Sequence, residues 1–538
     1  MKLIKSSKTN GNTPINKGRY YLYLSLAVIL AIVQVYFAIA VKNLINAVEY
    51  QSGSDKLFTS AVIVVAVVII SFLLGVFAKL LANSCQTSLE YSLKSKLFSD
   101  FLNGNYSEVQ KVLPGDLVSR LEGDVNTVAS VKTNLYPQVF STIVKLLGTA
   151  VALFVLQPTF TVIALLVTLI IAISSYYVRK VIYKLHANTR GKSSMQAVFL
   201  TETSLNSATI KTFNAEDYAS ANLNSKFLEY QNAKLKQKDF SALVGSAISL
   251  AFTCFYAVTV IFGAYGISKG IWGVNFGVLT ALLQLILQVR TPITSISGFF
   301  TAHAEMQVAS NRLNELFLEN VDNKIELSTF DKIIFDSVDF KYDDLPILQN
   351  VSFEINKGEN LVIKGQSGVG KTTIIKLLTG LYKPTSGSVK VIVGDKEYNA
   401  CEVKNLFACS LQSSTLFTKT VKENVVFNSE YDQDKYDNAV KTACLTDVLS
   451  GVSDSLVLNK DVNFSEGEKQ RVTIARAIYS LKAITVLDEP SSALDLETEK
   501  SLVDNLKKDK NTTFIIVSHR PAFDSFGKVI TLENGKII

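Results

Sequence analysis

The chain has 538 residues, of which 48% are hydrophobic and only 19% are charged. It is longer than one domain of ~100–200 residues, and the apolar excess lies in roughly the first 300 residues, which predicts a membrane half followed by a soluble half. The formal net charge of +7 comes largely from loops of the membrane half. No basic patch is interleaved with aromatic residues, so we expect no nucleic-acid partner. Five cysteines without a C-x-x-C spacing and three histidines exclude a disulfide framework and a zinc site.

Six long apolar stretches each approach the ~20 residues that a helix needs to cross a lipid bilayer. They cover residues 20–41, 57–78, 135–157, 159–178, 242–267 and 276–289, and the last continues past Pro292. The first stretch is longer than the apolar core of a signal peptide and five more follow it, so we do not expect it to be cleaved.

The charges on the connections predict how these spans are oriented. The basic tail and the long segments 79–134 and 179–241 alternate with short connections at 42–56, around Pro158 and at 268–275. Placing the long, basic segments inside satisfies the positive-inside rule at every crossing. We therefore expect a multi-pass protein of the cell membrane whose N-terminus and soluble half are both cytoplasmic.

The two long inner segments are expected to extend the membrane helices beyond the lipid. The first carries Leu89, Leu93 and Leu97 at helical spacing. Each segment also contains a polar stretch, at 115–125 and at 202–216. On spacing alone, either stretch is the solvated tip of a helical hairpin or a functional segment.

Lys145, Gln284 and Gln288 are the notable polar residues within the apolar spans, where polar side chains are costly and tend to face an aqueous cavity. Gln284 and Gln288 share one helix face at i, i+4, and we hypothesise that they line a substrate cavity. For Lys145 two interpretations stay open: it faces the same cavity, or its long side chain extends to the inner membrane surface.

A phosphate-binding pattern opens the soluble half. Residues 361–363 predict a buried strand and 374–378 predict a helix, and the pattern G-x-x-x-x-G-K-[ST] requires this context. Glycines allow the backbone N–H groups to surround a phosphate, while lysine reaches the outer phosphates and threonine binds Mg²⁺. The expected nucleotide-binding residues are Gly365, Gln366, Ser367, Gly368, Val369, Gly370, Lys371, Thr372 and Thr373.

Two adjacent acids, Asp488 and Glu489, end a buried strand predicted at 484–488. A strand end places Asp488 beside the phosphate loop, where it can hold Mg²⁺, and places Glu489 where it can orient and deprotonate a water molecule. The phosphate loop and these acids together predict nucleotide hydrolysis. Residues 333–335 and 338–342 are expected to form two short strands. Tyr342, at the end of the second strand and about twenty residues before the loop, is either a half-exposed strand residue or a stacking partner for adenine.

Residues 463–471, Asn-Phe-Ser-Glu-Gly-Glu-Lys-Gln-Arg, resemble the Leu-Ser-Gly-Gly-Gln signature of ATP-binding cassette (ABC) transporters. The superfamily's other marks follow in the expected order: Gln412 resembles the Q-loop, residues 492–495 the D-loop, and His519 the switch histidine. Six spans before a single cassette are similar to the exporter half-transporters. The two polar inner stretches resemble their coupling segments, so the resemblance covers nearly the whole chain.

The resemblance implies a dimer in which two cassettes face each other head to tail. Each ATP would then lie between one phosphate loop and the signature of the opposite chain, which is a second copy or a related half-transporter. Besides the phosphate loop, the resemblance assigns Tyr342, Ser465, Gly467, Glu468 and Asp495 to the nucleotide. It assigns catalysis to Lys371, Gln412, Glu489 and His519, and Mg²⁺ to Thr372, Gln412 and Asp488.

The signature departs from the family pattern at three positions. Phe464 replaces leucine, and Glu466 and Glu468 replace glycine and glutamine, while Ser465 and Gly467 are kept. Negative charge near a phosphate weakens binding if it points inward, whereas acids at a helix start stabilise the helix. The glycine-rich turn that often precedes the signature is absent at 457–462.

The expected fold class is an all-α transmembrane domain of six helices followed by an α/β P-loop nucleotide-binding domain. The expected boundaries are a basic cytoplasmic tail at 1–19, the transmembrane domain at 20–320 and the cassette at 321–538. The expected function is ATP-driven export, with ATP and Mg²⁺ as cofactors, of a peptide, a lipid or an amphipathic small molecule. The alternatives are an ATP-gated channel or regulator, and a soluble ABC-type ATPase, which the six spans argue against.

Overall fold

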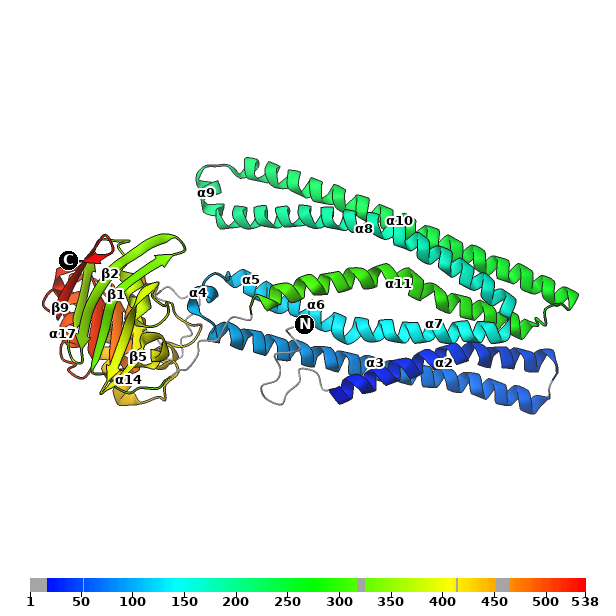
Figure 1. Cartoon of the computed structure of the whole chain (residues 1–538), viewed down its shortest axis with the longest axis horizontal. Coiled ribbons are helices and arrows are strands. Elements are labelled where there is room, and N and C mark those ends of the chain that lie inside the picture. The colour runs from blue at the N-terminus through cyan, green and yellow to red at the C-terminus, as the bar shows by residue number, and fades with distance from the viewer. Residues whose placement is uncertain (1–16, 52, 317–324, 413–414, 451–463) are drawn as a thin grey trace. The chain divides into compact units, whose positions relative to one another are not determined.

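The computed structural model describes residues 17–51, 53–316, 325–412, 415–450 and 464–538 (Figure 1). The chain forms two compact units, one helical and one α/β. The helical unit holds the described residues up to Ser99 and those from Pro114 to the end of helix α11. The α/β unit holds the C-terminal part of the chain together with the segment Asp100–Leu113.

Long helices make up the helical unit. They are α2 (Lys17–Glu49), α3 (Ser54–Asn103), α7 (Tyr136–Leu156), α8 (Pro158–Leu205), α10 (Glu216–Lys269) and α11 (Phe276–Asn314). Four helical stretches are long and apolar enough to cross a membrane: α2, α3, Pro114–Leu156 and α10. The apolar start of α11, Phe276–Arg290, is shorter, and side chains 163–177 of the expected fourth span are outside the described residues. Four of the six predicted spans are therefore confirmed in the described part of the chain.

Small and branched apolar residues let α2, α7 and α11 pack closely. Ala38, Ala281 and Leu285 are fully buried in their shared core. A Cβ at Gly277 would lie 2.6 Å from the Lys42 carbonyl oxygen, so α11 meets α2 where only glycine fits. On α3, Leu89, Leu93 and Leu97 are buried as their spacing predicts.

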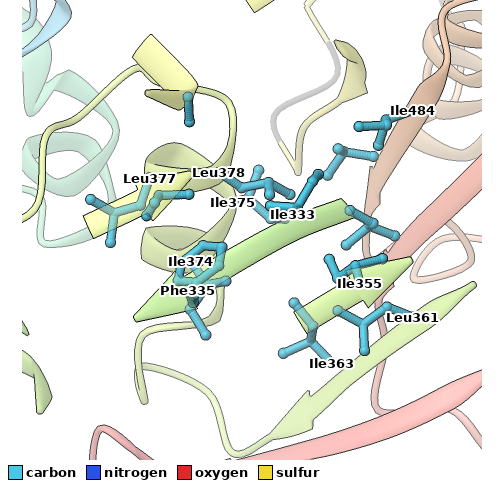
Figure 2. Close-up of a cluster of buried hydrophobic side chains, with 14 of the residues drawn as sticks. Ile333, Phe335, Ile355, Leu361, Ile363, Ile374, Ile375, Leu377, Leu378 and Ile484 are labelled. Carbon is cyan, nitrogen blue, oxygen red and sulfur yellow. The ribbon is translucent and has the colours of Figure 1, made fainter. Parts of the chain in front are cut away.

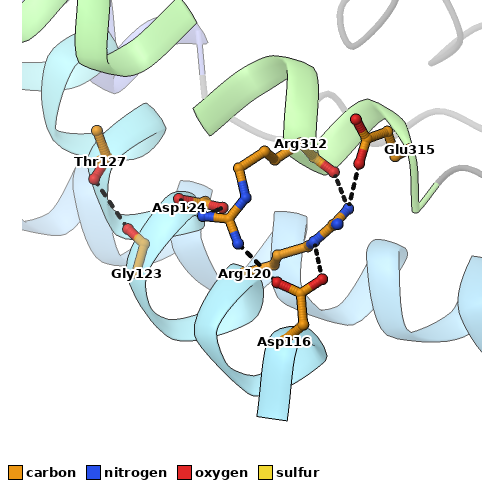
Figure 3. A network of polar contacts seen from close by, with 7 residues as sticks. All are labelled: Asp116, Arg120, Gly123, Asp124, Thr127, Arg312 and Glu315. Carbon is orange, nitrogen blue, oxygen red and sulfur yellow. Dashed lines mark hydrogen bonds and ion pairs between the residues drawn. The ribbon is translucent and has the colours of Figure 1, made fainter. Parts of the chain in front are cut away.

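Of the two interpretations open for stretch 115–125, the hairpin tip does not match the structure. It forms α5 (Pro114–Ser119) and a π-helical turn, η2 (Arg120–Asp124), which leads through α6 (Val125–Ser130) and η3 (Val131–Leu135) into α7. Arg120 pairs with Asp116 at 2.8 Å and with Glu315 at 2.9 Å, and Arg312 pairs with Asp116 at 2.7 Å and with Asp124 at 3.1 Å (Figure 3). These ion pairs fasten the stretch to the end of α11.

The other polar stretch, 202–216, does form the tip of a helical hairpin. Helix α8 ends at Leu205, the short α9 (Ser207–Thr212) follows, and α10 begins at Glu216 (Figure 1).

The α/β unit contains two sheets. The four-stranded antiparallel sheet has the order β2-β1-β4-β5, and the six-stranded sheet, parallel except for β10, has the order β10-β9-β3-β8-β7-β6. The first comprises β1 (Lys332–Tyr342), β2 (Leu345–Asn356), β4 (Ser386–Val393) and β5 (Lys396–Asn399). The second comprises β3 (Leu361–Gly365), β6 (Phe407–Ser410), β7 (Ile484–Asp488), β8 (Thr513–Val517), β9 (Lys528–Glu533) and β10 (Lys536–Ile537).

The two short strands expected at 333–335 and 338–342 are one strand, β1, with an irregular register between Phe335 and Val338. Ser337 lies at this irregularity with a φ of +50°. A bulge of this kind bends a strand without ending it, which explains why the sequence pattern looked interrupted.

One apolar core joins the two sheets through helix α12 (Lys371–Leu378) (Figure 2). A second core on the other face of the six-stranded sheet includes α13 (Val421–Val426), α14 (Gln433–Thr442), α16 (Glu466–Tyr479) and α17 (Leu496–Leu506). The parallel strands β3, β8 and β7 are neighbours, so their carboxyl ends meet at one edge of the sheet. Ligands bind at this edge in open α/β sheets.

Candidate nucleotide site

The phosphate loop connects β3 to α12 at this edge, as predicted. Its backbone needs glycine at two crowded positions. Gly365 has a φ of +148° and a Cβ there would lie 2.4 Å from the Leu532 carbonyl oxygen. Gly370 has a φ of +110° and a Cβ there would lie 2.9 Å from Leu348 Cδ2. Both positions combine a left-handed backbone with close contacts, so a side chain at either would distort the loop.

Lys371, at the start of α12, is buried and lies across the loop. Its Nζ donates to the carbonyl oxygens of Gly365 at 2.8 Å and Gln366 at 2.9 Å. An ammonium held over backbone carbonyls within a loop of N–H groups is placed to neutralise phosphate oxygens.

The two residues predicted to hold Mg²⁺ are in contact. Thr372 Oγ1 donates to Asp488 Oδ2 at 3.1 Å, and Asp488 is buried at the end of β7. A hydroxyl and a carboxylate are hard oxygen donors, which fit Mg²⁺. Gln412, the third predicted ligand, is exposed on the loop after β6.

Burial raises the pKa of Asp488, and the nearby Glu489 raises it further, while the Thr372 hydroxyl and Lys371 lower it. Because the pKa in the folded protein lies above that in the unfolded chain, ionisation of Asp488 opposes folding. Its stabilising contribution is present at low pH and is lost as the pH rises through the folded-state pKa.

Replacing Asp488 by Asn is therefore expected to raise the apparent melting temperature of the metal-free protein at pH 7, with a smaller gain near pH 4. The same change should lower Mg²⁺-dependent ATPase activity by more than about tenfold, since one of the proposed metal ligands loses its charge. Thermal unfolding in EDTA and phosphate release measure the two effects, and Asp395→Asn in an exposed turn is the control. A variant less stable than the wild type at pH 7 would contradict this account.

Glu489 and His519 lie together, as a catalytic role requires. His519 Nδ1 is 3.7 Å from Glu489 Oε1, and the Glu489 side chain is mostly buried whereas His519 is exposed. The backbone of Glu489 has a φ of +50°, and its N–H donates to the Val517 carbonyl oxygen at 2.8 Å. A non-glycine residue held in the left-handed region by the surrounding structure is typical of functional positions.

Tyr342 is half-buried at the end of β1. Its ring packs edge-on against Phe340 at 4.9 Å and against Tyr382 at 5.5 Å between centroids. It also lines a cleft of about 540 Å³ together with Lys341 and Lys383. The ring is thus held rigidly at an open surface, as a stacking platform would need.

The signature residues begin α16 with a capping box. Ser465 is the N-cap: its Oγ accepts from the Glu468 N–H at 3.2 Å and donates to Glu468 Oε2 at 2.9 Å, and its own N–H donates to Glu468 Oε2 at 2.7 Å. Glu466 points elsewhere, to Lys469 at 2.9 Å. Of the two acids, Glu468 therefore holds the serine hydroxyl, while Glu466 is an exposed surface charge. Residues 457–462, which replace the glycine-rich turn, are outside the described residues.

Replacing Glu468 by Gln is expected to lower the KM for ATP by roughly two- to tenfold, since it removes a negative charge beside the Ser465 hydroxyl, which we expect to contact ATP bound by a second chain. Stability should stay within about 0.5 kcal/mol, because glutamine also completes a capping box. Steady-state ATPase kinetics and thermal unfolding test both statements. Glu466→Gln is the matched control, and equal KM values for both variants would count against the assigned charge effect.

In the described part of the chain, Asp495 stabilises the start of a helix. It caps α17, and its Oδ2 accepts from the backbone N–H groups of Glu497 at 3.2 Å and Thr498 at 3.1 Å. A hydrogen bond with the Thr498 side chain, together with these backbone bonds, lowers the pKa of Asp495. A contact with nucleotide stays a prediction.

Sequence reasoning missed Gln470, a buried residue of α16. Its Nε2 donates to the Glu489 carbonyl oxygen at 2.6 Å, so it ties the signature helix to the backbone of the proposed catalytic acid. The only available indication was a polar residue on the apolar face of a predicted helix.

Sequence reasoning also missed the segment Asp100–Leu113, which packs within the α/β unit. Its helix α4 (Tyr106–Val109) places the Tyr106 ring edge-on to Tyr382 at 5.7 Å, and Tyr382 donates a hydrogen bond to Gln110 Oε1. Burial, with the neighbouring tyrosines, raises the pKa of Tyr382 to about 12, so its hydroxyl stays protonated and can donate. The turn residues Asn-Gly-Asn at 103–105 could have indicated this break between helices.

Comparisons with known proteins identify the family of the chain. Residues 20–293 match the ABC transporter transmembrane region and residues 348–492 match the ABC transporter model. An export ATP-binding/permease protein of Rickettsia conorii is 26% identical over 92% of this chain and 88% of its own length. The mitochondrial iron-sulfur clusters transporter ATM1 of Debaryomyces hansenii is 30% identical over 62% of this chain and 50% of its own length.

A solved structure shares the fold. A bacterial Atm1-family ABC exporter with ATP bound has a TM-score of 0.82 and 20% identity, and the match covers 97% of this chain and 95% of that one. The transmembrane and nucleotide-binding matches lie on one chain and in the order that the structure shows. The chain therefore belongs to the ABC transporter family and is an ATP-hydrolysing transport ATPase of the exporter type.

Proposed function

We propose that the chain is one half of a homodimeric exporter that moves its substrate out of the cytoplasm by alternating access. The observation that carries this proposal is the arrangement at one sheet edge of Thr372 and Asp488, 3.1 Å apart, beside Glu489 and His519, 3.7 Å apart. These groups provide metal ligation, a base and a phosphate contact on a chain that also carries a transmembrane domain.

In this mechanism Lys371 neutralises phosphate charge, Thr372 and Asp488 would hold Mg²⁺, and Glu489 accepts a proton from the attacking water. Bound Mg²⁺ would supply further charge neutralisation. Ser465 and Gly467, at the start of α16, present a hydroxyl and an N–H group to the ATP of the partner chain. ATP binding draws the cassettes together, and hydrolysis releases them.

The segment Asp100–Leu113 supports coupling between the cassette and the membrane helices. It continues directly from α3, a membrane-spanning helix, yet packs in the α/β unit against Tyr382. A movement of the cassette is thereby transmitted to α3. Tyr342, the proposed adenine contact, packs on the same tyrosine.

Transport by proteoliposomes tests the proposal. ATP added outside selects the molecules whose cassettes face outward, and a panel of labelled peptides, lipids and amphipathic drugs is offered with it. We expect ATP-dependent accumulation of at least one class, its loss in the Glu489→Gln variant, and a native mass of twice the 59.1 kDa of one chain. Ion currents without accumulation would instead indicate an ATP-gated channel.

A further inference from the structure

A lysine in the membrane helices is hydrogen-bonded to a neutral partner. Lys145, on α7, donates from Nζ to Gln34 Oε1 on α2 at 2.8 Å. Gln288, on α11, donates from Nε2 to the Gln34 carbonyl oxygen, also at 2.8 Å. Three helices thus meet around one polar cluster, Gln34, Lys145 and Gln288, which lies in the apolar packing of α2, α7 and α11.

This polar cluster lies deep in the spans. Lys145 is eleven residues from the end of α7 at Leu156, and Gln288 is twelve residues from the start of α11 at Phe276. At 1.5 Å per residue, both lie about 17–18 Å along their helices from the short connections, near the middle of a ~30 Å hydrocarbon layer. The interpretation that Lys145 extends to the membrane surface is therefore disfavoured, because its hydrogen bond to Gln34 holds it at this level.

The membrane spans hold no carboxylate that could neutralise Lys145. Asp and Glu are absent from residues 1–48, 56–89, 125–201 and 240–304, which include all six apolar stretches. A second copy of the chain would bring none either. A charge in the membrane is costly and is usually paired, so the counter-charge has to come from outside the protein.

Acceptor atoms without partners lie on α11, the helix that carries Gln288. Within the described residues, Gln284 Oε1 and Gln288 Oε1 are buried and accept no hydrogen bond. They lie one helical turn apart on α11, and buried polar atoms of this kind are normally satisfied. A ligand that carries an N–H group beside its negative charge would satisfy them.

We propose that Lys145, Gln34, Gln284 and Gln288 bind the head group of the transported substrate, an amphipathic monocarboxylate with an amide N–H next to the carboxylate. The single ammonium matches a single negative charge, the glutamine oxygens accept from the amide, and the apolar membrane helices around the cluster suit an apolar body. This assignment rests on the proposed export function and specifies its substrate class.

The test uses the full chain in phosphatidylcholine vesicles with four probes of equal chain length. They are N-dodecanoylglycine, its carboxamide, N-dodecanoylsarcosine, which lacks the N–H, and dodecyltrimethylammonium. For the wild type, we expect half-maximal stimulation of ATPase and of uptake by dodecanoylglycine at a concentration at least about tenfold lower than for the other three. This comparison of probes uses only the wild-type protein, so a folding defect in a variant cannot affect it.

Variants test which residues cause the preference for dodecanoylglycine. Lys145→Met should abolish the preference for carboxylate over carboxamide, Lys145→Arg should retain it, and Lys56→Met, at the exposed start of α3, should leave both basal ATPase and the preference unchanged. Gln284→Leu should abolish the preference for dodecanoylglycine over dodecanoylsarcosine.

Two results would overturn the assignment in distinguishable ways. If the carboxamide or the cation is accumulated as well as the carboxylate, or if Lys145→Met keeps the preference, export stands and the assigned head-group site is wrong. If ATP is hydrolysed but no compound of this set or of the wider panel is accumulated, the proposed export function fails, and the assignment with it.

Discussion

Replacing Glu489 by Gln is expected to lower ATP turnover by at least about 100-fold while ATP binding persists, the loss typical for removal of a general base. Glutamine keeps the shape of the side chain beside His519, whose Nδ1 lies 3.7 Å from the Glu489 carboxylate, but it cannot accept a proton from water. ATP should therefore bind and draw the cassettes together, and the closed state should accumulate. Phosphate release and retention of radiolabelled ATP on the purified protein measure the two parts.

Glu497→Gln, an exposed acid in the first turn of α17, is the control and should keep wild-type turnover. Turnover of Glu489→Gln within about threefold of the wild type would show that another group activates the water.

Replacing Gly467 by Ala is expected to reduce ATPase activity by more than about tenfold and to leave nucleotide binding to the phosphate loop almost unchanged. The new Cβ would lie 2.6 Å from the Ala493 carbonyl oxygen and 3.5 Å from Leu494 Cδ2, so either α16 or the D-loop has to move. Overpacking of this kind typically costs about 1–3 kcal/mol. The displaced N–H group at the helix start would also no longer reach the partner's phosphate.

ATPase kinetics, binding of a fluorescent ATP analogue and thermal unfolding separate these effects. Glu466→Ala, one position earlier and exposed, changes the same helix turn without the clash and should have little effect. If Gly467→Ala hydrolyses ATP at the wild-type rate, the close approach of Gly467 to the Ala493 carbonyl oxygen is not needed for the geometry of the nucleotide site.

Local chemistry made much of the nucleotide site predictable. The phosphate loop, Asp488 and Glu489 each follow a buried strand, and parallel strands bring their ends to one edge. The contact of Thr372 with Asp488 follows from that rule alone. The capping box of Ser465 and Glu468 could also be anticipated, since both residue types and their spacing are local.

Contacts between distant segments could not be predicted in this way. Stretch 115–125 has the composition of a solvated tip, and its ion pairs with Arg312 and Glu315 depend on the end of α11, which is distant in the sequence. The role proposed for Lys145 likewise depends on its hydrogen bond to Gln34, which lies on another helix. Spacing within one element carries no information about which element will lie opposite.

The segment Asp100–Leu113 also affects the order in which the chain can fold during its synthesis. It is made roughly 400 residues before the last strand of the unit in which it packs, which at about 5–20 residues per second leaves it without its partner for roughly 20–80 seconds. Tyr382 follows Tyr106 by 276 residues, so Tyr106 has no Tyr382 to pack against for about the first 14–55 seconds. The helical unit and the cassette therefore cannot fold as two independent units one after the other. The cassette is complete only after it has packed against a segment that was synthesised long before the rest of it.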